Sequence, residues 1–172
     1  SSLISTDPVK ARYFHSTKRF IDDLCAINDG YEFGKVYRDI YPVELELKVE
    51  HTGQHASFLN LDITMEENIF VYKLYDKRDA FPFTIVRMPE ITSNIPQSIF
   101  YSAFVGEVLR IARSTLRLLD FLPKAKELIN RMTKQGAKGY TSQRFLRRLI
   151  LNHPENFSQF HLSPGDLIKA LF

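Results

Sequence analysis

The sequence is poor in cysteine and has no long apolar run. Cys25 is the single cysteine among 172 residues, so the chain cannot form an internal disulfide, and this usage is typical of a reducing compartment. The absence of a CxxC pair or a histidine–cysteine cluster excludes the usual structural zinc sites. No stretch approaches the roughly twenty apolar residues of a membrane-spanning helix, and the first residues lack the segments of a signal peptide. We therefore expect an intracellular protein, in either nucleus or cytoplasm, with no membrane span.

Charge is unevenly distributed along the chain, although the net charge is only +3. Residues 1–96 carry 11 lysines and arginines against 15 aspartates and glutamates, whereas residues 97–172 carry 12 against 5. The first part is therefore net acidic and the second part is net basic. Such an asymmetry indicates that the basic part contacts a polyanion.

Two adjacent aspartates stand between apolar residues in the segment 18–27, which reads KRFIDDLCAI. Aspartate is tolerated in turns and depleted in strands, so we expect a hairpin with Asp22 and Asp23 at its tip. The two like charges repel each other, and a bound divalent cation offsets this repulsion because magnesium binds carboxylate oxygens. The dipeptide alone is compatible both with a metal-holding turn and with an ordinary acidic surface turn.

The rest of the acidic part predicts a short helix and several strands. Residues 33–41 have apolar residues at helical spacing and are followed by Pro42, which ends a helix. Apolar and charged residues alternate at 43–50, which predicts a strand with one buried face. A further strand is expected at 57–65, and Glu66-Glu67-Asn68 predicts a turn after it. Another strand is expected at 69–75, which is rich in aromatic and β-branched residues. With the hairpin, these segments predict one antiparallel sheet of about five strands.

The basic part has the apolar spacing of helices. The expected helices span residues 98–119, 120–134 and 143–152, with a short one after Ser163. Pro96 stands where a helix can begin, and Gly136 stands where the second helix should end. Thr141 or Ser142 is expected to cap the third helix. The predicted fold class is therefore α+β, with a small antiparallel sheet followed by an α-helical bundle.

This order of elements is that of a polymerase palm followed by a thumb, and the residues themselves resemble one family. Arg19-Phe20-Ile21-Asp22-Asp23 resembles the (F/Y)-x-D-D box of reverse transcriptases, with Phe20 in the aromatic position. The later segments that resemble non-retroviral, Penelope-like reverse transcriptases are IYPVELEL at 40–47, FLNLDI at 58–63, LYDKRD at 74–79 and the stretch 95–113. The resemblance covers roughly residues 12–152.

The resemblance implies an RNA-directed DNA polymerase, a metal-dependent nucleotidyltransferase that extends a primer 3′-hydroxyl with deoxynucleoside triphosphates. Two Mg²⁺ (or Mn²⁺) ions activate the attacking oxygen and stabilise the leaving oxygen in such a reaction. It implies that Asp22 and Asp23 are catalytic and hold the metal. Asp22 would be the direct ligand, and Asp23 would support it from the next layer of contacts.

One part of the family pattern is missing from this chain. The family's third catalytic carboxylate lies on an upstream strand, and Asp7 stands in no matching motif. The fingers and the first palm strands have no counterpart either. We therefore expect residues 1–90 to be the C-terminal part of a palm and residues 91–172 a thumb-like region, inactive alone. The expected partners are an RNA template with a DNA primer, deoxynucleoside triphosphates, and the upstream fingers and palm segment of the same polyprotein.

Basic residues are expected to hold the phosphates of the template–primer duplex, where they position the duplex without reading its sequence. Arg110, Arg113 and Arg117 are spaced i, i+3, i+7, which predicts a single helical face. The candidate nucleic-acid contacts are Lys73, Lys77, Arg78, Arg110, Arg113, Arg117, Arg144, Arg147 and Arg148. The alternative for each group is an ordinary solvated surface.

Two other functions remain compatible with the sequence. One is a non-catalytic nucleic-acid-binding or scaffold protein derived from a reverse transcriptase, in which the carboxylates are idle. The other is a metal-dependent nuclease that uses the same acids, although no further acidic motif supports it. An upstream strand with a third aspartate would distinguish the polymerase from the scaffold protein.

Overall fold

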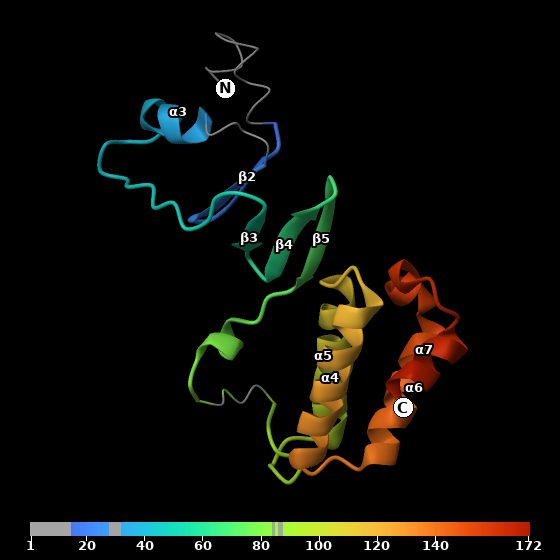
Figure 1. Ribbon diagram of the computed structural model, residues 1–172. Helices are drawn as coiled ribbons and strands as arrows, with labels where there is room; N and C mark the ends of the chain where they lie inside the picture. The colour runs from blue at the N-terminus through green and yellow to red at the C-terminus, as the bar shows by residue number, and fades with distance from the viewer. Residues whose placement is uncertain (1–14, 28–31, 84, 86–87) are drawn as a thin grey trace. The chain divides into compact units, whose positions relative to one another are not determined.

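The computed structural model describes residues 15–27, 32–83, 85 and 88–172 of the chain. It contains a two-stranded and a three-stranded antiparallel sheet followed by a C-terminal bundle of helices, so the predicted α+β class is confirmed (Figure 1). The chain divides into two compact units, Ser1–Leu59 and Asn60–Phe172. None of the helices in the described ranges combines the length and the apolar character that crossing a membrane requires.

The hairpin predicted around the two aspartates is present. β1 (Thr17–Phe20) and β2 (Asp23–Ala26) pair in the antiparallel sense, with Phe20 opposite Asp23. The connection between the strands is therefore the two-residue turn Ile21–Asp22. Such short connections favour backbone angles that match the twist of the strands, including positive φ.

The strand predicted at residues 43–50 is wrong, whereas the helix before it is confirmed as α3 (Glu32–Ile40). Residues 43–50 contain a turn and then no regular structure. The Arg38 Nη1 atom donates to the carbonyl oxygens of Val43 and Leu45, at 2.9 and 3.0 Å. Both side chains are exposed, Val43 by 76%. Alternating apolar and charged residues form a strand only where a neighbouring strand supplies backbone hydrogen bonds. Here the Arg38 side chain binds two of the carbonyl groups instead.

The second sheet has the order β3-β4-β5. Its strands are β3 (His55–Phe58), β4 (Leu61–Glu66) and β5 (Ile69–Leu74). The single strand predicted at 57–65 is wrong, because the chain turns at residues 59–60, where Leu59 has a φ of 56°. The single sheet of about five strands is also wrong, since the hairpin forms a sheet of its own.

The β4–β5 connection has the geometry that a tight hairpin requires. Glu66 pairs with Ile69, so Glu67 and Asn68 form the turn. Their φ angles are 47° and 66°, and positive values at both central residues are characteristic of a type I′ turn. This turn was expected from the Glu-Glu-Asn sequence, and it sets the register in which Leu61 lies opposite Leu74.

The helix predicted at 98–119 is shorter than expected. α4 (Gln97–Arg113) ends at Ser114, and α5 (Leu118–Lys134) begins after Arg117, whose backbone is extended. Between them, the Leu116 amide donates to the Tyr72 carbonyl oxygen of β5, at 2.9 Å. Thr115 is 1% exposed at the same point. A contact with a distant strand therefore breaks a stretch whose apolar spacing alone predicts a continuous helix.

α5 ends where the sequence predicted, but the next helix begins earlier. Gly136 has a φ of 92°, and a Cβ there would lie 2.7 Å from Ile91 Cγ2, so only glycine fits. α6 (Gly139–Asn152) follows, with Lys138 at the N-cap position. The predicted caps are wrong, since Ser142 is fully buried inside the helix.

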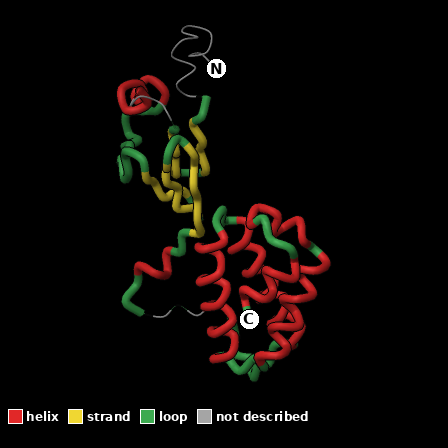
Figure 2. Tube along the Cα trace, turned by 45° about the vertical axis from the view of Figure 1, so that its right-hand side comes forward, coloured by secondary structure: helices red, strands yellow, loops and turns green. Residues whose placement is uncertain are grey.

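The helices of the second unit enclose one apolar core (Figure 2). After α6 come a 3₁₀ segment, η2 (Pro154–Phe160), and the predicted final helix, α7 (Pro164–Leu171), which the Ser163 hydroxyl caps. The fully buried large side chains include Phe100, Phe104, Phe121, Met132, Leu146 and Ile150. Leu74 of β5 belongs to the same core. The second compact unit therefore includes β4 and β5 together with the helices.

Candidate functional site

The two predicted metal ligands lie at the tip of the β1–β2 hairpin. Asp22 is the second residue of the turn, Asp23 is the first residue of β2, and both side chains are exposed. Magnesium in phosphoryl-transfer sites is held by one or two carboxylates together with substrate phosphates and water. The hairpin tip supplies two carboxylates, and both are open to solvent. The residues present therefore fit a magnesium ion of this kind.

Among the described residues, no group of three or more histidines, cysteines, aspartates and glutamates is arranged to hold a metal ion. The described part of the chain therefore offers the two carboxylates of the hairpin and no third ligand beside them.

The turn that carries Asp22 is strained at the residue before it. Ile21 has a φ of 53° and is 74% exposed. A β-branched residue rarely adopts this left-handed conformation, because its Cβ crowds the following carbonyl group. Exposure means that no burial of the Ile21 side chain offsets this cost. Backbone strain of this kind is concentrated at functional sites, where it fixes the direction of a neighbouring side chain.

Replacing Ile21 with asparagine is expected to stabilise the hairpin by about 1 kcal/mol, because asparagine tolerates positive φ. Amide hydrogen exchange of β1 and β2 in the full chain would report the gain as slower opening. Val49→Asn is the matched control, since Val49 is also β-branched and is 63% exposed, but its φ is ordinary. Equal exchange in Ile21→Asn and the wild type would show that the turn is not strained.

Arg19 supports the strained turn from β1. Its Nε donates to the Ile21 carbonyl oxygen at 2.9 Å, and its Nη1 donates to the Tyr41 hydroxyl at 3.3 Å. The guanidinium carbon also lies 5.3 Å from the centre of the Tyr41 ring, within cation–π distance. Arg19 therefore connects the turn to the residue that follows α3. Sequence reasoning assigned no role to Arg19, since Tyr41 is 22 residues away.

Cys25 lies on β2, opposite Lys18 and close to the aspartates. Partial burial raises the pKa of the Cys25 thiol above its ordinary value. A raised pKa keeps the thiol protonated at neutral pH, and the protonated form is a poor nucleophile and a poor metal ligand. In this environment Cys25 acts as a small, partly buried apolar side chain beside the turn.

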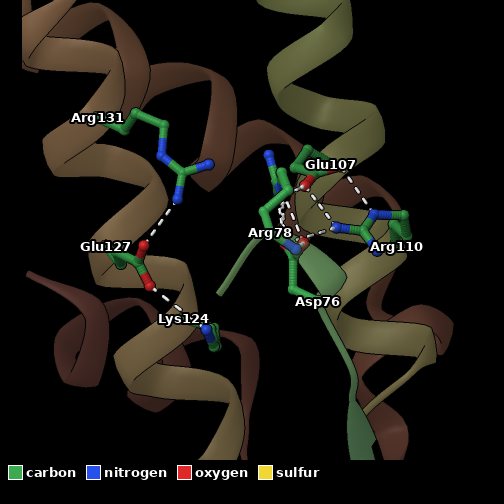
Figure 3. Close-up of polar contacts among 7 residues, drawn as sticks. All are labelled: Asp76, Arg78, Glu107, Arg110, Lys124, Glu127 and Arg131. Atoms are coloured by element: carbon green, nitrogen blue, oxygen red, sulfur yellow. Dashed lines mark hydrogen bonds and ion pairs between the residues drawn. The ribbon is translucent and has the colours of Figure 1, made fainter. Parts of the chain in front are cut away.

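Four charged residues of the second unit form an internal ion-pair network (Figure 3). Asp76 caps η1 (Lys77–Ala80) and accepts hydrogen bonds from Arg78, whose Nε lies 2.7 Å from Asp76 Oδ1. Arg78 also lies 3.5 Å from Glu107, and Glu107 binds Arg110 at 2.6 Å. The hydrogen bond that Arg110 donates to Glu107 is the main cause of the raised pKa of Arg110. Arg78 and Arg110, two of the nine residues predicted to contact phosphate, therefore form ion pairs with carboxylates of the same unit.

Removing the Arg78 side chain is expected to destabilise the second unit by about 2 kcal/mol, because partly buried carboxylates lose their ion partner. The Arg78 side chain is 12% exposed and that of Asp76 is 8% exposed, so water compensates only in part. Chemical denaturation of Arg78→Met and of Lys77→Met, an exposed neighbour, would measure the difference. Equal unfolding free energies in the two variants would contradict the structural role of Arg78.

The predicted face of Arg110, Arg113 and Arg117 does not exist as one helical surface. Arg113 is the last residue of α4, and Arg117 precedes α5. Arg113 donates to the Asn156 side chain at 2.9 Å, and Arg117 binds Glu66 of β4 at 2.5 Å. The hydrogen bond that Arg117 donates to Glu66 raises the pKa of Arg117. The i, i+3, i+7 spacing places three residues on one face only if the helix is continuous. Here the helix breaks after Arg113, so the three arginines do not share a face.

The other predicted contacts are more open. Lys77 is exposed, and Lys73 is 55% exposed but lies 3.7 Å from Asp62. Arg144, Arg147 and Arg148 are all exposed on α6. Within the described ranges, no carboxylate pairs with any of these three arginines. Contact with nucleic acid stays a prediction for every basic residue named, and α6 offers the charges that are free to make it.

The structure also places a residue on α6 that sequence reasoning left out. Tyr140 is 68% exposed in the first turn of the helix. The signal was present in the sequence as the i, i+4 spacing of Tyr140 and Arg144. The helix predicted at 143–152 does not include Tyr140, whereas the observed α6 begins at Gly139 and includes it.

Comparisons with protein-family models, with curated proteins and with solved structures find no match to this chain.

Proposed function

We propose that this chain is the C-terminal palm and thumb portion of an RNA-directed DNA polymerase that transfers deoxynucleotides to a primer 3′-hydroxyl. The observation that carries the proposal is the hairpin tip, where a strained Ile21 precedes two adjacent, exposed carboxylates. The strain has no packing reason in this turn, and it suits a site that must present Asp22 in one direction.

In the proposed mechanism, Asp22 would hold the catalytic metal ions directly, and Asp23 would support the site. When bound, the metal ions supply charge neutralisation for the triphosphate and activation of the primer hydroxyl. The chain's own contribution is position: the hairpin holds Asp22, and Arg19 holds the turn through the Ile21 carbonyl oxygen and Tyr41. Catalysis of this kind depends mainly on positioning and on electrostatic stabilisation.

The proposal requires a third carboxylate from an upstream fingers and palm segment of the same polyprotein. Among the described residues, no group of three or more histidines, cysteines, aspartates and glutamates could hold a metal ion, so the proposed site needs a ligand from that segment. RNA template, DNA primer and deoxynucleoside triphosphates are the proposed partners. The basic second part of the chain supports a polyanionic partner, since residues 97–172 carry 12 basic against 5 acidic side chains.

Primer extension on an RNA template by the full-length polypeptide tests the proposal. The expected result is template-directed synthesis that requires Mg²⁺ or Mn²⁺ and stops when one deoxynucleotide is withheld. A full-length polypeptide that binds the template–primer without extending it would instead support the non-catalytic scaffold protein. Degradation of the template without synthesis would support the nuclease.

A further inference from the structure

One face of α6 carries an aromatic ring and three arginines in a continuous stripe. Tyr140, Arg144, Arg147, Arg148 and Leu151 are spaced i, i+4, i+7, i+8 and i+11, which places them on one side of a helix. All five side chains are exposed, Tyr140 by 68% and Leu151 by 59%. The opposite side of α6 is buried in the core. The α6 stripe is therefore a surface that the packing of this unit leaves open.

The charge around the α6 stripe has a single sign. Residues 128–154 contain no aspartate or glutamate. The same stretch contains six basic residues, Arg131, Lys134, Lys138, Arg144, Arg147 and Arg148. Arg131 binds Glu127, whereas no carboxylate of the described residues pairs with the three arginines of the stripe. This distinguishes them from Arg78, Arg110 and Arg117, which all bind carboxylates.

We propose that the α6 stripe binds a single-stranded segment of nucleic acid, with an unpaired base stacked on Tyr140 and phosphates held by Arg144, Arg147 and Arg148. Proteins bind single-stranded nucleic acid with exposed aromatic rings beside cationic side chains, because every unpaired base offers a stacking face. The paired bases of a duplex are already stacked on each other and have no face for Tyr140. The inference rests on the proposed function only in its choice of nucleic acid as the partner.

An anionic membrane is a weaker match to the same surface. Membrane-surface helices insert a broad apolar face beneath the headgroups. The apolar residues of α6, including Leu146, Leu149 and Ile150, are buried in the core of the unit. The exposed side has one aliphatic residue, Leu151, in the last turn of α6, at the opposite end from Tyr140.

The phosphate part of the proposal is tested by the affinity of the full chain for a short fluorescent oligouridine at several salt concentrations. Changing Arg144, Arg147 and Arg148 to glutamine should make the slope of log affinity against log salt shallower by about 2, since three contacts are lost from a single strand. The matched control changes Lys126, Lys134 and Lys169 to glutamine. These three exposed lysines carry the same total charge and lie on other helices. Equal losses in both triple variants would overturn the assignment to α6.

The stacking part is tested at Tyr140. Tyr140→Leu should weaken oligouridine binding by about tenfold, and Tyr140→Phe should retain it, because phenylalanine keeps the ring. Because Tyr140 is exposed, neither variant is expected to disturb folding. Full affinity in Tyr140→Leu, tighter binding of a blunt duplex than of oligouridine, or preferential binding to phosphatidylserine vesicles would each overturn the inference.

The same assay distinguishes this inference from the proposed function. Asp39→Ala should leave oligouridine binding unchanged, since Asp39 lies on α3, outside the stripe. Polymerase activity with no contribution of the stripe to binding would overturn only the inference. Oligouridine binding that depends on the stripe, with no polymerase activity in the full-length polypeptide, would overturn only the proposed function.

Discussion

Replacing Asp22 with alanine is expected to reduce primer extension by the full-length polypeptide at least a hundredfold. Asp22 is one of two carboxylates at the hairpin tip and is proposed to bind the catalytic metal directly. Residues that only support a metal ligand typically contribute about 10–100-fold, so loss of a ligand should cost at least the upper end of that range. Single-turnover primer extension with excess enzyme would measure the chemical step.

The size of the effect should differ between the two aspartates. Asp23→Asn is expected to lower the rate by about 10–100-fold, since Asp23 is proposed to act from the next layer of contacts. Asp39→Ala is the matched control, because Asp39 is an exposed aspartate on α3 of the same unit. Primer extension that survives Asp22→Ala would remove Asp22 from the mechanism. A loss of the same size in Asp39→Ala would point to general charge effects.

Replacing Phe121 with alanine is expected to destabilise the second unit by about 3–5 kcal/mol, the range for a large aromatic side chain removed from a core. Phe121 is completely buried in the first turn of α5. Its ring centre lies 4.7 Å from that of Phe160 and 6.0 Å from that of Phe157. The side chain thus joins α5 to η2, and its loss would leave a cavity bounded by two rings.

Urea denaturation of the full chain, followed by circular dichroism, would measure this loss. Leu119→Ala is the matched control on the same helix, since Leu119 is 68% exposed and should change stability by less than about 0.5 kcal/mol. Phe121→Leu should fall between the two, because leucine fills part of the space. Similar unfolding free energies for Phe121→Ala and Leu119→Ala would mean that the aromatic cluster does not hold the helices together.

Much of this fold follows from local sequence signals. The Asp-Asp dipeptide between apolar residues predicts the β1–β2 hairpin, helical spacing before Pro42 predicts α3, and the Glu-Glu-Asn turn predicts the β4–β5 connection. Gly136 marks the end of α5, because its conformation excludes other residues. These features depend on neighbours within a few positions, so the chain specifies them without knowledge of distant contacts.

Other features could not be read from local patterns. Residues 43–50 alternate like a strand, but their carbonyl groups bind Arg38. The stretch 98–119 is spaced like one helix, but its end is held by Tyr72 of β5. In both cases a partner elsewhere in the fold competes with the local preference, and that partner is invisible to periodicity.

By itself, the sequence determined the α+β class, the acidic turn that carries Asp22 and Asp23, and the surplus of basic residues in the second part of the chain. Only the tertiary structure decided which basic residues are free. Arg117 binds Glu66, 51 positions away, and Arg78 reaches Glu107 on another helix, whereas the arginines of the α6 stripe face solvent. The physical reason is that charges are paired by distance in space, and spacing along the chain does not determine that distance between separate elements.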